Sequence, residues 1–154
     1  MSAVTVPDLG ALPPMDLPAR LERLVGRFEE AGIDALLVTD LLNVRYLTGF
    51  SGSAGLLAVT HDGLTLVTDG RYGEQAPLEA AAAGADVDVQ VAGTGQKDLV
   101  SELLAAVPRL GLEAEHVTWA QQRSYATDWF PESELVATEG LVAGLREVKD
   151  DGEV

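Results

Sequence analysis

The sequence predicts a three-layer α/β/α domain around a mixed, mostly parallel sheet of about five to six strands. Short apolar segments typical of strands alternate with longer segments of helical periodicity, which favours parallel strands joined by helices. One Asp-Gly pair lies between two strand-like segments and predicts a tight antiparallel hairpin. The sheet is therefore expected to contain both kinds of pairing.

The first expected elements are an arm and one helix. Residues 1–15 are rich in proline, show no hydrophobic period and are expected to form a loose arm. Asp16 can cap a helix, and the apolar stripe over 17–28 predicts one continuous helix that ends at Gly32.

A buried strand and a short helix should follow. The apolar run 35–38 is typical of a strand covered on both faces. Thr39 or Asp40 can cap a brief helix through Tyr46, and Gly49 would stop it.

The middle of the chain contains the hairpin. Strands are expected over 56–60 and 64–68, joined by a turn at 61–63. An alanine-rich helix over 72–83 should follow, and the alternating valines of 87–91 predict a strand with one face in solvent.

The last elements follow the same alternation. Helices are expected over 96–107, 118–130 and 141–149, and strands over 109–113 and 134–137. Trp119 and Phe130 are three helical turns apart, so we expect them to share one face, by default in the core. If that face is exposed, it is a surface for another domain or subunit.

Composition narrows the function classes. The chain has 25 acidic and 10 basic residues, a formal net charge of −15, so neither nucleic acid nor a membrane surface is expected as a partner. The absence of cysteine excludes disulfides, cysteine-ligated zinc and thiol catalysis. We find no signal-peptide pattern and no apolar run of membrane-spanning length, and a cytoplasmic location is expected.

Residues that could perform chemistry are few. Besides His61, in the predicted turn, the only histidine is His116, which could bind a cation with Glu113 and Glu115, although a solvated loop is the simpler interpretation. Asp86 and Asp88 could pair on one strand face, but two solvent-exposed charges are commoner. Short serine and glycine motifs at 51–55 and 93–95 match neither a nucleophile elbow nor a dinucleotide site.

Several blocks, in a characteristic order, reveal a resemblance. They are 33–38, Asn43-Val44-Arg45-Tyr46-Leu47-Thr48-Gly49-Phe50 with Gly52-Ser53, Thr68-Asp69-Gly70-Arg71-Tyr72 with Gln75-Ala76, 113–115, and 145–150 with 152–153. From Arg20 onward the chain resembles the N-terminal domain of the Xaa-Pro aminopeptidase, prolidase and creatinase family, a fold with a ribonuclease H-like motif.

The resemblance implies a division of labour between two domains. The resemblance implies a parent enzyme that cleaves the N-terminal residue from Xaa-Pro peptides, using two divalent ions (Mn, Co or Zn) held by a C-terminal catalytic domain. We therefore expect 16–140 to be the N-terminal domain and 141–154 to begin the linker to a catalytic domain that is missing here. No catalytic residue and no cofactor are expected in this chain.

The expected partners are the catalytic domain, a second subunit in a homodimer and a proline-containing peptide substrate. Six residues are candidates for the substrate pocket or a domain interface: Asn43, Arg45, Tyr46, Phe50, Arg71 and Tyr72. The aromatic rings offer flat apolar walls, and the arginines offer donor forks to a carboxylate. Arg71 could instead pair with Asp69 or Asp40, and Tyr72 could simply pack.

Two alternatives remain open. The chain could be a stand-alone α/β binding or assembly module, or the N-terminal domain of a creatinase-like hydrolase, because relatives with different substrates share this pattern.

Overall fold

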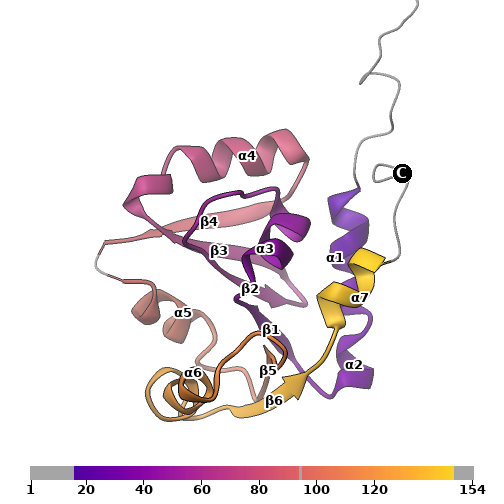
Figure 1. Ribbon diagram of the computed structural model, residues 1–154, viewed down its shortest axis with the longest axis vertical. Coiled ribbons are helices and arrows are strands. Elements are labelled where there is room, and N and C mark those ends of the chain that lie inside the picture. The colour runs from indigo at the N-terminus through magenta and orange to yellow at the C-terminus, as the bar shows by residue number, and fades with distance from the viewer. Residues whose placement is uncertain (1–15, 94, 148–154) are drawn as a thin grey trace, which may run out of the picture.

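A single six-stranded mixed sheet forms the centre of the computed structural model, which describes residues 16–93 and 95–147 (Figure 1). The strand order is β4-β3-β2-β1-β5-β6. The strands are β1 (Ala35–Val38), β2 (Leu56–Thr60), β3 (Gly63–Asp69), β4 (Val87–Ala92), β5 (Arg109–Glu113) and β6 (Glu134–Thr138). β2 pairs antiparallel with β1 and with β3, whereas β3 with β4, β1 with β5 and β5 with β6 are parallel. The predicted fold class is confirmed.

Helices cover both faces of the sheet. They are α1 (Leu17–Val25), α2 (Phe28–Ala31), α3 (Leu41–Thr48), the 3-10 turn η2 (Gly70–Tyr72), α4 (Gln75–Ala83), α5 (Lys97–Leu103), α6 (Trp119–Ser124), the π-helical turn η3 (Tyr125–Trp129) and α7 (Leu141–Glu147). One apolar core lies against α1, α2, α3 and α7, and a second lies against α5 and η3. β1 contributes alternate residues to the two cores, so it is buried on both faces as predicted.

The prediction of one continuous helix near the N-terminus is wrong. Two helices, α1 and α2, replace it, because Gly26 ends α1 and the Arg27 amide turns back to the Leu24 carbonyl at 3.0 Å. Glycine is a poor residue for a helix interior, which favours a break at this point. Phe28, the first residue of α2, is buried in the core. The predicted ends are confirmed: Asp16 caps α1, and Gly32 follows α2 with φ 75°.

The hairpin is confirmed with a small shift. Thr60 pairs with Gly63, so the turn consists of His61 and Asp62, and Gly63 begins β3 with φ 141°. Helix starts and ends differ elsewhere: the segment expected as a helix from Tyr72 begins as the turn η2, and α5 ends at Leu103.

The late aromatic residues do not share a face. α6 changes to the π-helical turn η3, which shifts the angular position of every later residue. Phe130 is 1% exposed in the core, whereas Trp119 is 78% exposed. The expectation of common burial is therefore wrong. No helix among the described residues is long and apolar enough to cross a bilayer.

Candidate functional site at the carboxyl edge of the sheet

The loops that follow the parallel strands gather at one edge of the sheet. The parallel pairings place the carboxyl ends of β1, β3, β4, β5 and β6 on the same side, and the segment before β2 joins them there because β2 runs the other way. β1 continues into α3 on one face and β5 continues towards α6 on the other, which makes their shared end a topological switch point. Ligands of open α/β sheets bind at such edges.

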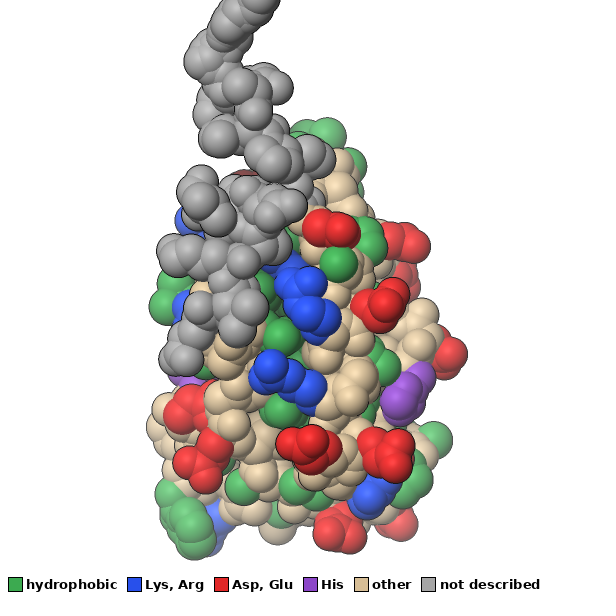
Figure 2. Space-filling model, turned by 90° about the vertical axis from the view of Figure 1, so that its right-hand side faces the viewer, with side chains coloured by type: hydrophobic (Ala, Val, Ile, Leu, Met, Phe, Trp, Pro, Cys, Tyr) green, Lys and Arg blue, Asp and Glu red, His purple; other side chains and the backbone are tan. Residues whose placement is uncertain are grey.

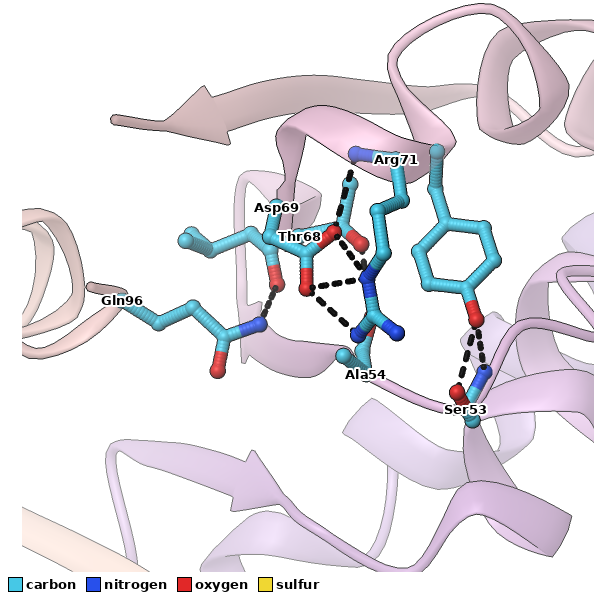
Figure 3. Close-up of polar contacts among 8 residues, drawn as sticks. Ser53, Ala54, Thr68, Asp69, Arg71 and Gln96 are labelled. Atoms are coloured by element: carbon cyan, nitrogen blue, oxygen red, sulfur yellow. Dashed lines mark hydrogen bonds and ion pairs between the residues drawn. The ribbon is translucent and has the colours of Figure 1, made fainter. Parts of the chain in front are cut away.

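Asp69 and Arg71 form the most complete ion pair of this edge (Figure 3). The Asp69 carboxylate accepts from the Arg71 amide at 3.0 Å, from Nε at 3.1 and 3.2 Å, and from Nη2 at 2.8 Å. Arg71 holds the pKa of the Asp69 carboxyl below its usual value, and Asp69 raises the pKa of the guanidinium. Since Nε and Nη2 are engaged, Nη1 is the donor that Arg71 can still offer to a ligand.

Tyr72 closes the loop before β2. Its hydroxyl oxygen accepts from the Ser53 amide at 3.1 Å and shares a 2.6 Å hydrogen bond with the Ser53 hydroxyl. These bonds lower the pKa of the phenol from its usual value. The Tyr72 ring meets the buried Phe50 ring edge-on at 5.3 Å. A Cβ at Gly52 would lie 2.2 Å from Phe50, so only glycine fits there.

Two further hydrogen bonds hold this part of the edge. The Thr68 hydroxyl donates to the Ala54 carbonyl at 2.6 Å, and the Gln96 side-chain amide donates to the Val67 carbonyl at 3.3 Å (Figure 3). Arg71 and Tyr72 thus follow closely after a strand whose end is hydrogen-bonded on two sides.

Glu113 organises the end of β1. Its carboxylate accepts from the Thr39 amide at 2.7 Å, the Asp40 amide at 2.9 Å and the Asn43 side-chain amide at 2.5 Å. Glu113 is 2% exposed, so the interpretation of this residue as part of a solvated loop is wrong. It joins β5 to the start of α3, and it holds Asn43 in the interior.

Tyr46 lies inside the domain as well. Its hydroxyl donates to the Leu145 carbonyl at 3.1 Å. The Arg20 guanidinium stacks on the Tyr46 ring at 4.0 Å and donates to the Tyr46 carbonyl at 2.7 Å. Arg45, which precedes Tyr46 on α3, is exposed. Among the candidates, Phe50, Arg71 and Tyr72 therefore form one group, whereas Asn43 and Tyr46 have buried structural contacts.

The remaining polar residues of the edge are spread out. His116 Nδ1 lies 3.9 Å from the Asp40 carboxylate, and Glu115 accepts from the Gly140 amide at 3.3 Å. Within the described residues, no group of three or more histidine or acidic side chains is placed to hold a metal ion.

The match with known families decides the identity of the domain. Residues 20–148 match the model of the Creatinase/Prolidase N-terminal domain. This chain belongs to that family. The six-stranded sheet and its covering helices are thus a creatinase/prolidase N-terminal domain, as the sequence blocks indicated.

Individual relatives agree with this assignment. The chain is 34% identical over 135 residues to an uncharacterized peptidase, YqhT, of Bacillus subtilis, a match that covers 88% of this chain and 37% of the relative. A Xaa-Pro dipeptidase from Bacillus anthracis superposes with a TM-score of 0.78 at 30% identity, covering 90% of this chain and 38% of that one. The N-terminal domain of the cytoplasmic peptidase PepQ from Mycobacterium tuberculosis gives 0.71 at 36% identity, covering 83% and 98%.

These coverages show which part of a peptidase the chain resembles. It spans little more than a third of the full-length relatives but almost all of a solved N-terminal domain. These relatives are peptidases or parts of peptidases, and this chain matches the N-terminal domain of one of them.

Proposed function

We propose that the chain is the non-catalytic N-terminal domain of a Xaa-Pro aminopeptidase or dipeptidase. In the intact enzyme it assists oligomer assembly and closes one wall of the substrate pocket. The coverage of the relatives supports the first part of this proposal, since the chain matches a solved N-terminal domain over nearly its whole length. Two divalent ions, Mn, Co or Zn, would belong to the catalytic domain, and a cytoplasmic homodimer is the proposed form.

The pocket wall is proposed at Arg71 and Tyr72. The observation that supports it is the fixed loop at the carboxyl edge, where Arg71 Nη1 is free of the Asp69 pair and the Tyr72 ring lies between Phe50 and solvent. A preorganised donor beside an aromatic ring suits a peptide carbonyl or carboxylate next to a proline ring.

Kinetics of the full-length enzyme test this wall. We expect Arg71→Gln to raise KM for a Xaa-Pro peptide about tenfold with little change in kcat, because a donor that binds ground state and transition state equally affects KM alone. Arg123→Gln, on the exposed surface of α6, is the matched control and should leave both constants unchanged. An unchanged KM in Arg71→Gln would exclude this wall.

Light scattering of the 154-residue chain tests the assembly role. A dimer supports it. A monomer would contradict assembly through this domain alone.

A further inference from the structure

Three arginines line one groove where α1, α3, α4 and α7 meet. Its volume is about 570 Å³, and its lining residues are Arg20, Leu42, Arg45, Tyr46, Gly49, Glu79, Ala82, Ala83 and Arg146. The chain as a whole carries a net charge of −15, so three guanidinium groups around one hollow form a local reversal of charge. Basic side chains also lie together on the face that carries α1 and α7 (Figure 2).

The floor of this arginine groove is rigid. Arg20 is 2% exposed, and its guanidinium is fixed by the ring and the carbonyl of Tyr46. The Tyr46 hydroxyl reaches the carbonyl of Leu145 on α7. Because these contacts join α1, α3 and α7, the groove exists before any ligand arrives, and little ordering is needed on binding.

Arg45 and Arg146 keep donors for a ligand. The Arg146 Nε atom is buried and has no hydrogen-bond partner in the described chain. Arg45 is attracted to Glu79. The Glu79 carboxylate, however, already accepts from the Ser51 backbone amide at 3.0 Å, the Ser51 hydroxyl at 2.7 Å and the Gln75 side-chain amide at 3.1 Å. A buried donor without an acceptor is unfavourable, so the groove favours a ligand that brings acceptor oxygens.

An exposed apolar side chain at the rim of the groove also restricts the kind of ligand that fits. Leu42 is 64% exposed beside these arginines. Arginine next to exposed apolar surface is typical of the energetic centre of a protein interface. The ligand that fits is therefore a peptide segment with carboxylates and at least one apolar side chain, rather than a small inorganic anion.

We propose that the arginine groove receives an acidic segment of the catalytic domain in the full-length enzyme, with carboxylates on Arg45 and Arg146 and an apolar side chain on Leu42. This inference rests on the proposed function. α7 is the last described helix and supplies Arg146, so the polypeptide that continues towards the catalytic domain starts beside the groove. The matched part makes up only 37% of one full-length relative, so most of that protein lies outside it.

The first experiment tests the chemistry of the groove. A fluorescent, end-capped hexapeptide of alternating Glu and Leu is titrated into the 154-residue chain, beside a version with Gln in place of Glu. The acidic probe should bind at least about tenfold more tightly, and both Arg45→Gln and Arg146→Gln should weaken it about tenfold. The control Arg123→Gln should bind like the unmodified chain. Equal binding of the two probes, or equal weakening by Arg123→Gln, would overturn the inference.

The second experiment tests the occupant. The full-length enzyme should bind the acidic probe at least about tenfold more weakly than the isolated chain, because its own segment fills the groove. Undiminished binding by the full-length enzyme would overturn the assignment, as would a dimer of the isolated chain that Arg45→Gln dissociates, since the occupant would then be a second copy. Neither readout needs peptidase activity, so failure of the proposed function would be seen separately.

Discussion

Glu113 is the residue on which the hydrogen bonds at the end of β1 converge. Its carboxylate accepts from two backbone amides and from the Asn43 side chain, and it is nearly inaccessible to solvent. An acceptor in this position satisfies donors that α3 and the preceding turn would otherwise bury without partners.

Replacing the Glu113 carboxylate should destabilise the folded domain. We expect Glu113→Gln to lower the free energy of unfolding by roughly 2–3 kcal/mol, because the amide nitrogen turns one acceptor into a donor that faces other donors. Urea unfolding followed by circular dichroism measures the change. Glu115→Gln, at an exposed position, is the control and should stay within about 0.5 kcal/mol of the unmodified chain. Equal values for the two variants would refute the assigned role of Glu113.

Gly52 offers a second residue-level prediction. A Cβ there would lie 2.2 Å from Phe50 and 2.9 Å from Tyr72, whereas a Cβ at Gly70 would meet nothing within 4 Å. Gly52→Ala should therefore destabilise the domain by about 1–3 kcal/mol and disturb the Tyr72 loop, and Gly70→Ala should be close to neutral. Thermal unfolding of the two variants gives the comparison. A Gly52→Ala chain as stable as the unmodified one would contradict the close contact of Gly52 with the two rings.

At the scale of elements, α3 is packed against α4 through a glycine. Gly49 ends α3 with φ 84°, and a Cβ there would lie 2.5 Å from the Ala83 Cβ on α4. Gly84 ends α4 with φ 80° and open space around it. The two glycines share the same backbone conformation and differ only in their neighbours.

This pair separates backbone strain from packing. Gly84→Ala should cost about 1 kcal/mol, the penalty for a left-handed alanine, and Gly49→Ala should cost at least about 1 kcal/mol more because the two helices must move apart. Chemical denaturation of both variants tests the difference. Equal losses would mean that α3 and α4 are not in close contact at Gly49.

The start of β1 is tied to β5 by an ion pair that titrates in acid. The Asp34 carboxylate accepts from Arg109 Nε and Nη2, both at 3.1 Å, and from the Arg109 amide at 3.0 Å. Arg109 lowers the pKa of Asp34 in the folded chain, so its contribution is present above the unfolded pKa of about 3.9 and is lost as the pH falls through the lower folded value.

Thermal unfolding between pH 6 and pH 2 should show this loss. The unmodified chain is expected to lose stability below about pH 4, and Asp34→Asn should lose less over the same window because one linked carboxyl is gone. The pair is exposed, so the difference will be modest. Identical acid profiles would show that the ion pair makes no contribution.

Local patterns explain why much of the fold could be predicted. The apolar run of β1, the Asp-Gly turn and the caps at Asp16 and Gly32 depend on neighbours within a few residues, and all are confirmed. Glu113 could not be assigned in the same way, since its partners lie about 70 residues away in the chain.

The candidate site shows the same limit. The blocks around Phe50 and Tyr72 were recognisable, but the Ser53 bond to Tyr72 and the burial of Asn43 depend on how separate loops meet. The π-helical turn that turns Trp119 away from Phe130 leaves no periodic signal in the sequence.

The whole molecule combines a strongly acidic composition with one arginine-lined groove and one ordered sheet edge. Both features lie on a domain that matches peptidase N-terminal domains over nearly their full length. They are suited to contacts with another domain or with a peptide.

Hydrolysis of a Xaa-Pro peptide, measured side by side for the purified 154-residue chain and for the full-length enzyme with added Mn²⁺, tests this division of labour most directly. We predict cleavage by the full-length enzyme and none by the chain alone. Cleavage by the chain alone, lost when His61 and His116 are both replaced by Ala, would contradict the account.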